Sequence, residues 1–233
     1  MLNQKSTRII LTALWGLFAI AVTGQPLNGT TGLMNIPSAM MQKDGAFMAG
    51  VNYLPNEVTP GSFDYDTGNY YFNITFLPFF EFSYRMTLME MDSGNYNQDR
   101  SFGMRLRLWR ESGFLPALVI GGNDLYSSSG QNATYFNSLY VVTTRNFPLG
   151  KSSLELTAGY AHEGFREYHQ GNMKGFFFGG SLSPGFCPSL RLMGEYDTQA
   201  CNIGSSCLFF RHLFLFAMLY DLKIPLGGVA VCF

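Results

Sequence analysis

Charged residues are scarce in this chain of 233 residues, because Asp, Glu, Lys and Arg together make up only 13%. Soluble domains usually carry about a quarter of charged residues, so the surface of this protein is short of ionic groups. The formal net charge is −1. A nucleic-acid partner would need a basic patch, and nothing in the sequence indicates one.

Residues that carry catalytic or metal chemistry are also few. The four cysteines, Cys187, Cys201, Cys207 and Cys232, lack metal-ligand spacing such as Cys-x-x-Cys, and they read as small apolar residues for which a disulfide stays possible. The glycine-rich run 175–180 lies within a strand pattern and lacks the Lys-Ser/Thr ending of a phosphate loop. The sequence therefore predicts no enzyme, no cofactor and no metal.

Only the N-terminus carries a run that resembles a targeting segment. Lys5 and Arg8 precede an unbroken apolar stretch at 9–22, and Gly24 supplies a small residue for cleavage. The apolar stretch is too short to span a membrane comfortably as a helix, which takes roughly 20 residues. We expect 1–24 to be a signal peptide for Sec-type export.

What the sequence has in abundance is apolar and aromatic side chains. Hydrophobic residues make up 47% and aromatic residues 16%, with 22 Phe and 13 Tyr. So much Phe and Tyr with so little charge favours a lipid-facing surface bordered by aromatic girdles. An aromatic-rich soluble β-protein is the alternative that composition alone leaves open.

The connections between apolar segments alternate between two kinds. One kind is tight and contains proline: 77–79, 114–116, 147–150 and 184–188. The other is polar and mostly longer: 55–68, 92–99, 126–134 and 164–174. Up-and-down barrels of the outer membrane have this alternation of short periplasmic turns and longer outer loops.

Period-2 alternation between these connections predicts about twelve strands. They are expected at 45–54, 69–77, 80–91, 100–109, 115–125, 134–146, 152–163, 175–183, 189–197, 201–209, 213–221 and 226–233. We therefore predict an all-β fold, an antiparallel up-and-down transmembrane β-barrel over 44–233. The terminal Phe233, with apolar residues two and four positions earlier, is typical of the last strand of a bacterial outer-membrane barrel.

Charged side chains recur on the polar side of the predicted strands. They are Glu81, Arg85, Arg105, Arg107, Glu155, Arg191, Glu195 and Asp197. An outward-facing Arg near the middle of the bilayer would cost about 2–4 kcal/mol, so we expect these residues to line the lumen. Because both signs are interleaved, they predict salt bridges across a narrow lumen rather than an ion-selective pore.

The residues before the first strand, 25–43, mix Gly, Thr, Asn and Pro and do not read as a strand. We expect this segment to fold inward as a plug of the lumen, ahead of a turn at Asp44-Gly45.

An ordered set of short motifs resembles the YjbH family. The run Gly32-Leu33-Met34-Asn35-Ile36-Pro37-Ser38-Ala39, followed by Asp44-Gly45, is similar to the opening of that family. Four further blocks follow in the family's order: the block that begins with Asp99-Arg100, the blocks 115–118 and 121–124, and the triplet 195–197. The resemblance, to a short single-barrel form, implies an outer-membrane barrel associated with exopolysaccharide or capsule production.

Three functions follow from these readings. The first is a structural or transport component of exopolysaccharide or capsule export, located in the outer membrane of a Gram-negative bacterium, with membrane lipid, polysaccharide and envelope export proteins as partners. The second is an outer-membrane hydrolase that acts on lipid or lipopolysaccharide and uses His162 or His169 near the outer rim. The third is a soluble secreted β-protein that binds glycans.

Overall fold

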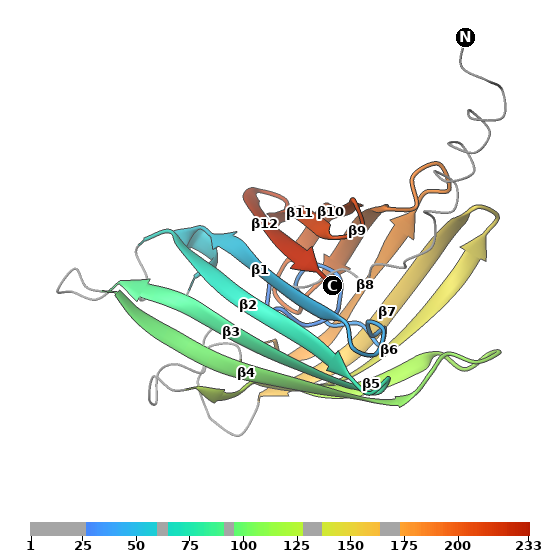
Figure 1. Ribbon diagram of the computed structural model, residues 1–233, viewed down its shortest axis with the longest axis horizontal. Helices are drawn as coiled ribbons and strands as arrows, with labels where there is room; N and C mark the ends of the chain where they lie inside the picture. Colours follow the sequence, from blue (N-terminus) through green and yellow to red (C-terminus); the bar gives the residue numbers. More distant parts are fainter. Residues whose placement is uncertain (1–26, 60–64, 91–95, 128–136, 164–172) are drawn as a thin grey trace, which may run out of the picture.

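The twelve predicted strands close into one antiparallel barrel (Figure 1). The computed structural model describes residues 27–59, 65–90, 96–127, 137–163 and 173–233. Each strand pairs with its neighbours in sequence, and β1 pairs with β12 to complete the ring. Within the described residues no helix is long and apolar enough to cross a membrane. The predicted fold class is confirmed.

The strand bounds follow the predicted ranges closely, and β7, β8 and β10 have the predicted bounds. The strands are β1 (Phe47–Leu54), β2 (Thr67–Phe76), β3 (Phe80–Glu90), β4 (Tyr96–Trp109), β5 (Ala117–Ser127), β6 (Ser138–Leu149), β7 (Ser152–Glu163), β8 (Gly175–Ser183), β9 (Leu190–Tyr196), β10 (Cys201–Phe209), β11 (Leu213–Tyr220) and β12 (Ile224–Cys232). A short 3₁₀ helix, Asn56–Val58, follows β1.

Two connections are shorter than the sequence predicts. The predicted turn at 147–150 is wrong, because β6 continues through Pro148, which lies opposite Ser153 of β7. Proline is tolerated near a strand end, where its missing N–H costs little of the ladder. The predicted loop at 92–99 is also too long, because β4 begins at Tyr96 and pairs with the end of β3.

The two faces of the strands differ as a membrane barrel requires. On β3, Glu81 and Arg85 point inward and are buried, while Phe82 and Tyr84 alternate with them on the outer face. Outside, aromatic rings form a band across five neighbouring strands with centroid distances of 5.2 to 6.3 Å: Phe47, Phe72, Tyr84, Phe102 and Tyr126. Such a band fits lipid better than water.

Residues 27–43, which precede β1, lie inside the ring of strands, where Figure 1 draws them in blue. We call residues 27–43 the lumen segment. Its apolar side chains Leu33, Met34, Ile36 and Ala39 are fully buried, and they belong to the same core cluster as inward-facing residues of the wall. A segment without regular structure can be buried only where its backbone groups find partners, which the lumen-facing side chains supply.

The barrel has two distinct ends. One, the tight-turn end, carries the connections after the even strands β2, β4, β6, β8 and β10, together with the start of β1 and the end of β12. The other, the long-loop end, carries the connections after the odd strands. The lumen segment reaches β1 at the tight-turn end through the turn 43–46, in which the N–H of Ala46 donates to the carbonyl of Lys43 and Gly45 has φ 77°.

Candidate functional site

The candidate site is the lumen, where charged and amide side chains of the wall bind the lumen segment. Leu33, Met34 and Ile36 show no exposure, so their backbone groups depend on protein partners. These partners come from strands on opposite sides of the ring, among them Glu81 of β3 and Glu195 of β9.

The first anchor is the pair Glu81 and Arg105, whose side chains are fully buried and whose Oε1 and Nη1 atoms lie 3.1 Å apart. The Glu81 carboxylate accepts hydrogen bonds from the backbone N–H and the hydroxyl of Thr31, at 2.8 and 2.5 Å. The Arg105 guanidinium donates to the carbonyls of Thr31, Ser38 and Met40. A buried ion pair is tolerable only when most of its remaining donors and acceptors are used. Here the lumen segment uses all of them that are paired, and only Nε of Arg105 is buried without a partner.

The second anchor is Glu195, which binds the segment through backbone amides. Its carboxylate accepts from the N–H groups of Met34, Asn35 and Ile36 at 3.0, 2.7 and 3.4 Å. Asn202 of β10 donates to the same carboxylate at 3.1 Å. Three consecutive amides that converge on one carboxylate form a charge-assisted contact, which is stronger than an ordinary hydrogen bond.

Asp197, just after β9, extends this anchor toward the long-loop end. Its carboxylate accepts from Nδ2 of Asn35 at 2.6 Å and from Nδ2 of Asn202 at 3.0 Å. It also accepts from the backbone N–H groups of Gln199 and Ala200, at 3.1 and 2.8 Å. With four donors, Asp197 joins the lumen segment to the β9–β10 turn.

A set of neutral side chains completes the contacts on the β1–β2 wall. Asn52 and Asn69 both donate to the carbonyl of Leu27, and Asn73 donates to that of Gly29. These asparagines were not selected from the sequence, since no charge or motif marked them. Asp124 was placed in a family motif block, 121–124, but was not selected as a residue that lines the lumen. The signal of the asparagines was their position on the polar side of the alternating strands.

The remaining charged residues of the wall pair with each other. Arg85 contacts both carboxylate oxygens of Asp124, at 2.9 and 2.8 Å, and Oδ1 of Asn28 in the lumen segment at 3.2 Å. Arg191 lies 3.2 Å from Glu155 and donates to Ser181 at 2.6 Å.

Arg107 differs from the other predicted residues. It is half-buried and donates to the carbonyl of Pro78 in the β2–β3 turn, so it lies at the tight-turn end.

The motif residues also have defined places. Gly32 and Pro37 form an isolated bridge that closes the tip of the lumen segment, with Asn35 inside the turn. Asp99 lies 4.0 Å from Arg85 in the wall. Arg100 is exposed and donates to Gln98.

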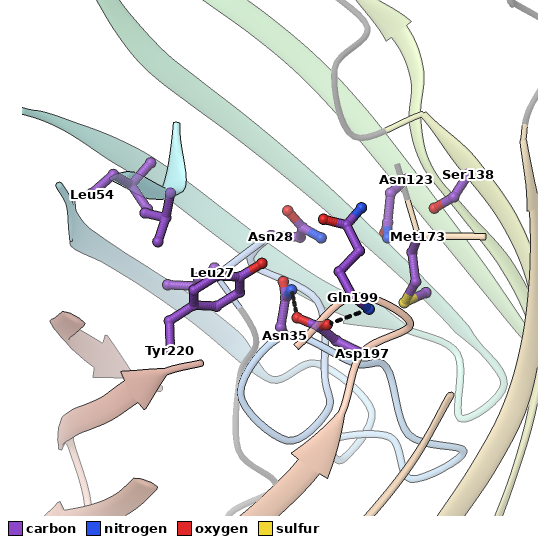
Figure 2. Close-up of a pocket in the computed structure, with 11 residues that line it drawn as sticks. Leu27, Asn28, Asn35, Leu54, Asn123, Ser138, Met173, Asp197, Gln199 and Tyr220 are labelled. Carbon is purple, nitrogen blue, oxygen red and sulfur yellow. Dashed lines mark hydrogen bonds between the residues drawn. The ribbon is translucent and has the colours of Figure 1, made fainter. Parts of the chain in front are cut away.

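A cavity of about 60 Å³ lies above the lumen segment at the long-loop end, and Figure 2 shows its lining side chains. Amide, hydroxyl and carboxylate groups dominate one part of the lining: Asn28, Asn35, Asn123, Ser138, Asp197 and Gln199. Leu27, Leu54, Val58, Met173 and Tyr220 complete it. None of the eleven described residues around this cavity carries a positive charge. We call it the mouth cavity.

Of the two histidines of the hydrolase hypothesis, the structure describes only His162. The Nδ1 of His162 bonds to the carbonyl of the adjacent Glu163 at 2.5 Å. His169 lies outside the described residues. His212 is at the opposite, tight-turn end, where its Nδ1 bonds to the carbonyl of Cys232.

A closed antiparallel barrel with an apolar outer face and an ion-paired polar interior defines a transmembrane β-barrel of the outer-membrane type. The chain belongs to the YjbH family, whose model, "Exopolysaccharide biosynthesis protein YbjH", matches residues 25–211. The family resemblance read from the motifs is thereby confirmed.

Three solved structures are similar to this chain. The "KdgM porin" is 10% identical, with a TM-score of 0.49 over 80% of this chain and 98% of that chain. The outer membrane phospholipase (OMPLA) dimer of Salmonella typhi is 13% identical, with a TM-score of 0.42 over 81% and 89%. Outer membrane phospholipase A of Escherichia coli is 14% identical, with a TM-score of 0.39 over 81% and 95%. No curated protein matches the sequence significantly.

Proposed function

We propose that this protein is a non-enzymatic barrel of the outer membrane of a Gram-negative bacterium, and that it serves exopolysaccharide or capsule production as a structural or transport component. The observation that carries the proposal is the occupied lumen: Arg105 and Glu195 both hold the chain's own segment inside the barrel. A barrel filled in this way does not act as an open diffusion pore. Membership of a family described by exopolysaccharide biosynthesis supplies the process.

In this proposal the predicted lumen residues hold a plug. Glu81, Arg85, Arg105, Glu195 and Asp197 all contact residues of the lumen segment directly. Arg191 and Glu155 pair with each other on the wall. Because a buried charge without its partner is costly, the segment stays in place unless a partner protein or polysaccharide offsets the loss.

The mouth cavity is the place where a polysaccharide would touch the protein. Its asparagine, glutamine and serine side chains can both donate and accept hydrogen bonds, as sugar hydroxyl groups do. Tyr220 adds an aromatic surface at its edge. The absence of positive charge among its described lining residues favours a neutral sugar unit over an anionic one.

The test is a deletion of the gene in the bacterium that encodes it, followed by measurement of cell-bound and released polysaccharide. The proposal predicts a severalfold loss of surface polysaccharide, restored by the wild-type gene. Complementation by the double variant Asn123→Ala, Gln199→Ala is expected to restore less than complementation by Lys223→Ala, which changes an exposed residue beside Asp221. Unchanged polysaccharide after deletion would contradict the proposal.

The non-enzymatic part of the proposal has its own test. Purified protein is assayed on labelled phospholipid and lipopolysaccharide beside the variants His162→Ala and His169→Ala. The proposal predicts no turnover above a heat-denatured sample for any of them. Turnover that either substitution abolishes would establish the hydrolase instead.

A further inference from the structure

Four of the five tight turns of the barrel present a phenylalanine to their surroundings, and Phe147 lies near the end of β6, beside the fifth turn. Together with the C-terminal residue they form what we call the phenylalanine rim: Phe79, Phe114, Phe147, Phe186, Phe210 and Phe233. Phe114, Phe186 and Phe210 are 92%, 87% and 88% exposed, so no part of the described protein covers them. Large apolar side chains this exposed on three turns of one end indicate a surface that lipid or a protein partner covers.

Basic residues share this end. Lys43, Arg110, Lys151 and Arg211 are exposed beside the rim, and Arg145 lies within it. The acidic side chains in the connections of the same end are Asp44 and Glu111. The connection 55–66 at the long-loop end has the opposite balance, since it carries Glu57, Asp64 and Asp66 and no Lys or Arg.

Arg145 links the basic groups to the rings. Its guanidinium lies over the ring of Phe147 at 5.3 Å and near that of Phe114 at 5.9 Å. It also donates to the carbonyls of Phe114 and Gly113 at 2.7 and 3.2 Å. Two rings of the rim are therefore held in place by a cation–π contact that combines the two chemistries of this end.

We propose that the phenylalanine rim and its basic residues form an interfacial anchor that binds the anionic phospholipid headgroups of the membrane leaflet at the tight-turn end. Aromatic rings prefer the headgroup boundary, and each Lys or Arg near an anionic surface adds attraction. The proposal goes beyond the polysaccharide role and does not depend on it.

The distribution of the rim favours a lipid leaflet over a protein partner. The phenylalanines lie on four of the five tight turns, near the end of β6 beside the fifth, and on the chain end, so they encircle the barrel. A planar leaflet meets such a ring everywhere, whereas a protein partner covers one continuous patch. The rim also continues the lipid-facing wall, since Leu108 and Trp109 at the end of β4 are exposed on its outer side.

The first test measures lipid selectivity of the reconstituted full chain by electron spin resonance with spin-labelled phosphatidylglycerol and phosphatidylcholine. The wild type is expected to prefer phosphatidylglycerol roughly fivefold at low salt and to lose the preference at high salt. The triple variant Arg110→Gln, Lys151→Gln, Arg211→Gln is expected to lose most of it. The matched control at the other end, Arg100→Gln, Lys174→Gln, Lys223→Gln, is expected to keep it.

Equal selectivity of the test and control variants, or no selectivity in the wild type, overturns the proposal. A rim that binds a protein partner instead of lipid would show no selectivity in pure lipid. Heat-modifiable gel mobility reports whether each variant is folded.

A second measurement needs no change in the rim. The chain has 2 tryptophans, so Trp15→Phe in the full chain leaves Trp109, beside the β4–β5 turn, as the single reporter. Brominated lipids with bromine just below the headgroup are expected to quench Trp109 more strongly than lipids with bromine at the chain end. Stronger quenching from the chain end, or none from either, overturns the proposal.

Discussion

Arg105 and Glu81 lie on neighbouring strands with Nη1 and Oε1 3.1 Å apart, and both side chains also bind the backbone of the lumen segment. The pair therefore does two things. Each charge neutralises the other, which matters because a single unpaired charge in the interior would be costly. The pair also supplies hydrogen-bond donors and acceptors to a segment without regular structure. The wall and its contents are stabilised by the same atoms.

Removing one member of this pair is expected to destabilise the barrel strongly. Arg105→Leu leaves the Glu81 carboxylate buried without its cation and frees the carbonyls that Arg105 binds. Loss of one partner of a buried ion pair costs about 3–5 kcal/mol. Urea unfolding of the protein in lipid vesicles measures the change.

The control for this substitution is Arg100→Leu, because Arg100 is exposed and donates to the side chain of Gln98. A surface change of this kind is expected to alter the free energy of unfolding by no more than about 0.5 kcal/mol. Equal losses in the two variants would show that the buried pair has no special role.

Glu195→Gln tests the amide anchor of the lumen segment. The amide nitrogen of Gln cannot accept the hydrogen bonds that the carboxylate accepts from Met34, Asn35 and Ile36. We expect these backbone amides to exchange with deuterium at least about tenfold faster, since each lost charged contact costs 1–3 kcal/mol. Glu163→Gln, which removes a pair with the largely exposed Lys174, should leave their exchange unchanged.

Gly29 is a position that only glycine fits. Its φ is 75°, and a Cβ there would lie 2.8 Å from Cβ of Tyr71. Gly29→Ala is expected to destabilise the protein by about 1–3 kcal/mol in vesicle unfolding. Gly194→Ala is the matched control, because a Cβ at Gly194 meets nothing within 4 Å; it is expected to be neutral or slightly stabilising. Equal destabilisation by both would remove the steric explanation.

Asp66 gives a pH dependence at the long-loop end. The hydroxyl of Tyr53, and then the backbone N–H of Asn56, donate to its carboxylate and hold the pKa of Asp66 below the ordinary 3.8. A lowered folded pKa means that this contribution is complete above the ordinary value and is lost as the pH falls through the folded value. The amide resonance of Asn56 should therefore shift only below about pH 3.8. In Asp66→Asn it should not titrate.

Much of the barrel could be predicted because the strands and turns depend on residues that are close together in the sequence. Period-2 alternation and turn chemistry set where a strand begins and ends, and β7, β8 and β10 have the predicted bounds. Proline misled the reading of β6, since Pro148 continues the strand next to the turn at Gly150 instead of forming it. Once the strands are placed, each one is expected to pair with the next strand in the sequence.

The contents of the lumen could be predicted only in part. The inward charges were visible because a lipid-facing Arg or Glu is costly. Their partners were not, because Glu195 and Met34 lie 161 residues apart in the chain. Asn52 and Asn69 carry no charge, so their role at Leu27 appears only once the segment is placed between them.

The central claim is that the lumen segment keeps the barrel closed. The most direct measurement is ionic conductance in a planar bilayer, with the wild type compared to the double variant Arg105→Gln, Glu195→Gln, which weakens both anchors. The claim predicts no sustained current from the wild type and clear opening events from the double variant. A steady open channel in the wild type, with the same conductance as the double variant, would contradict it.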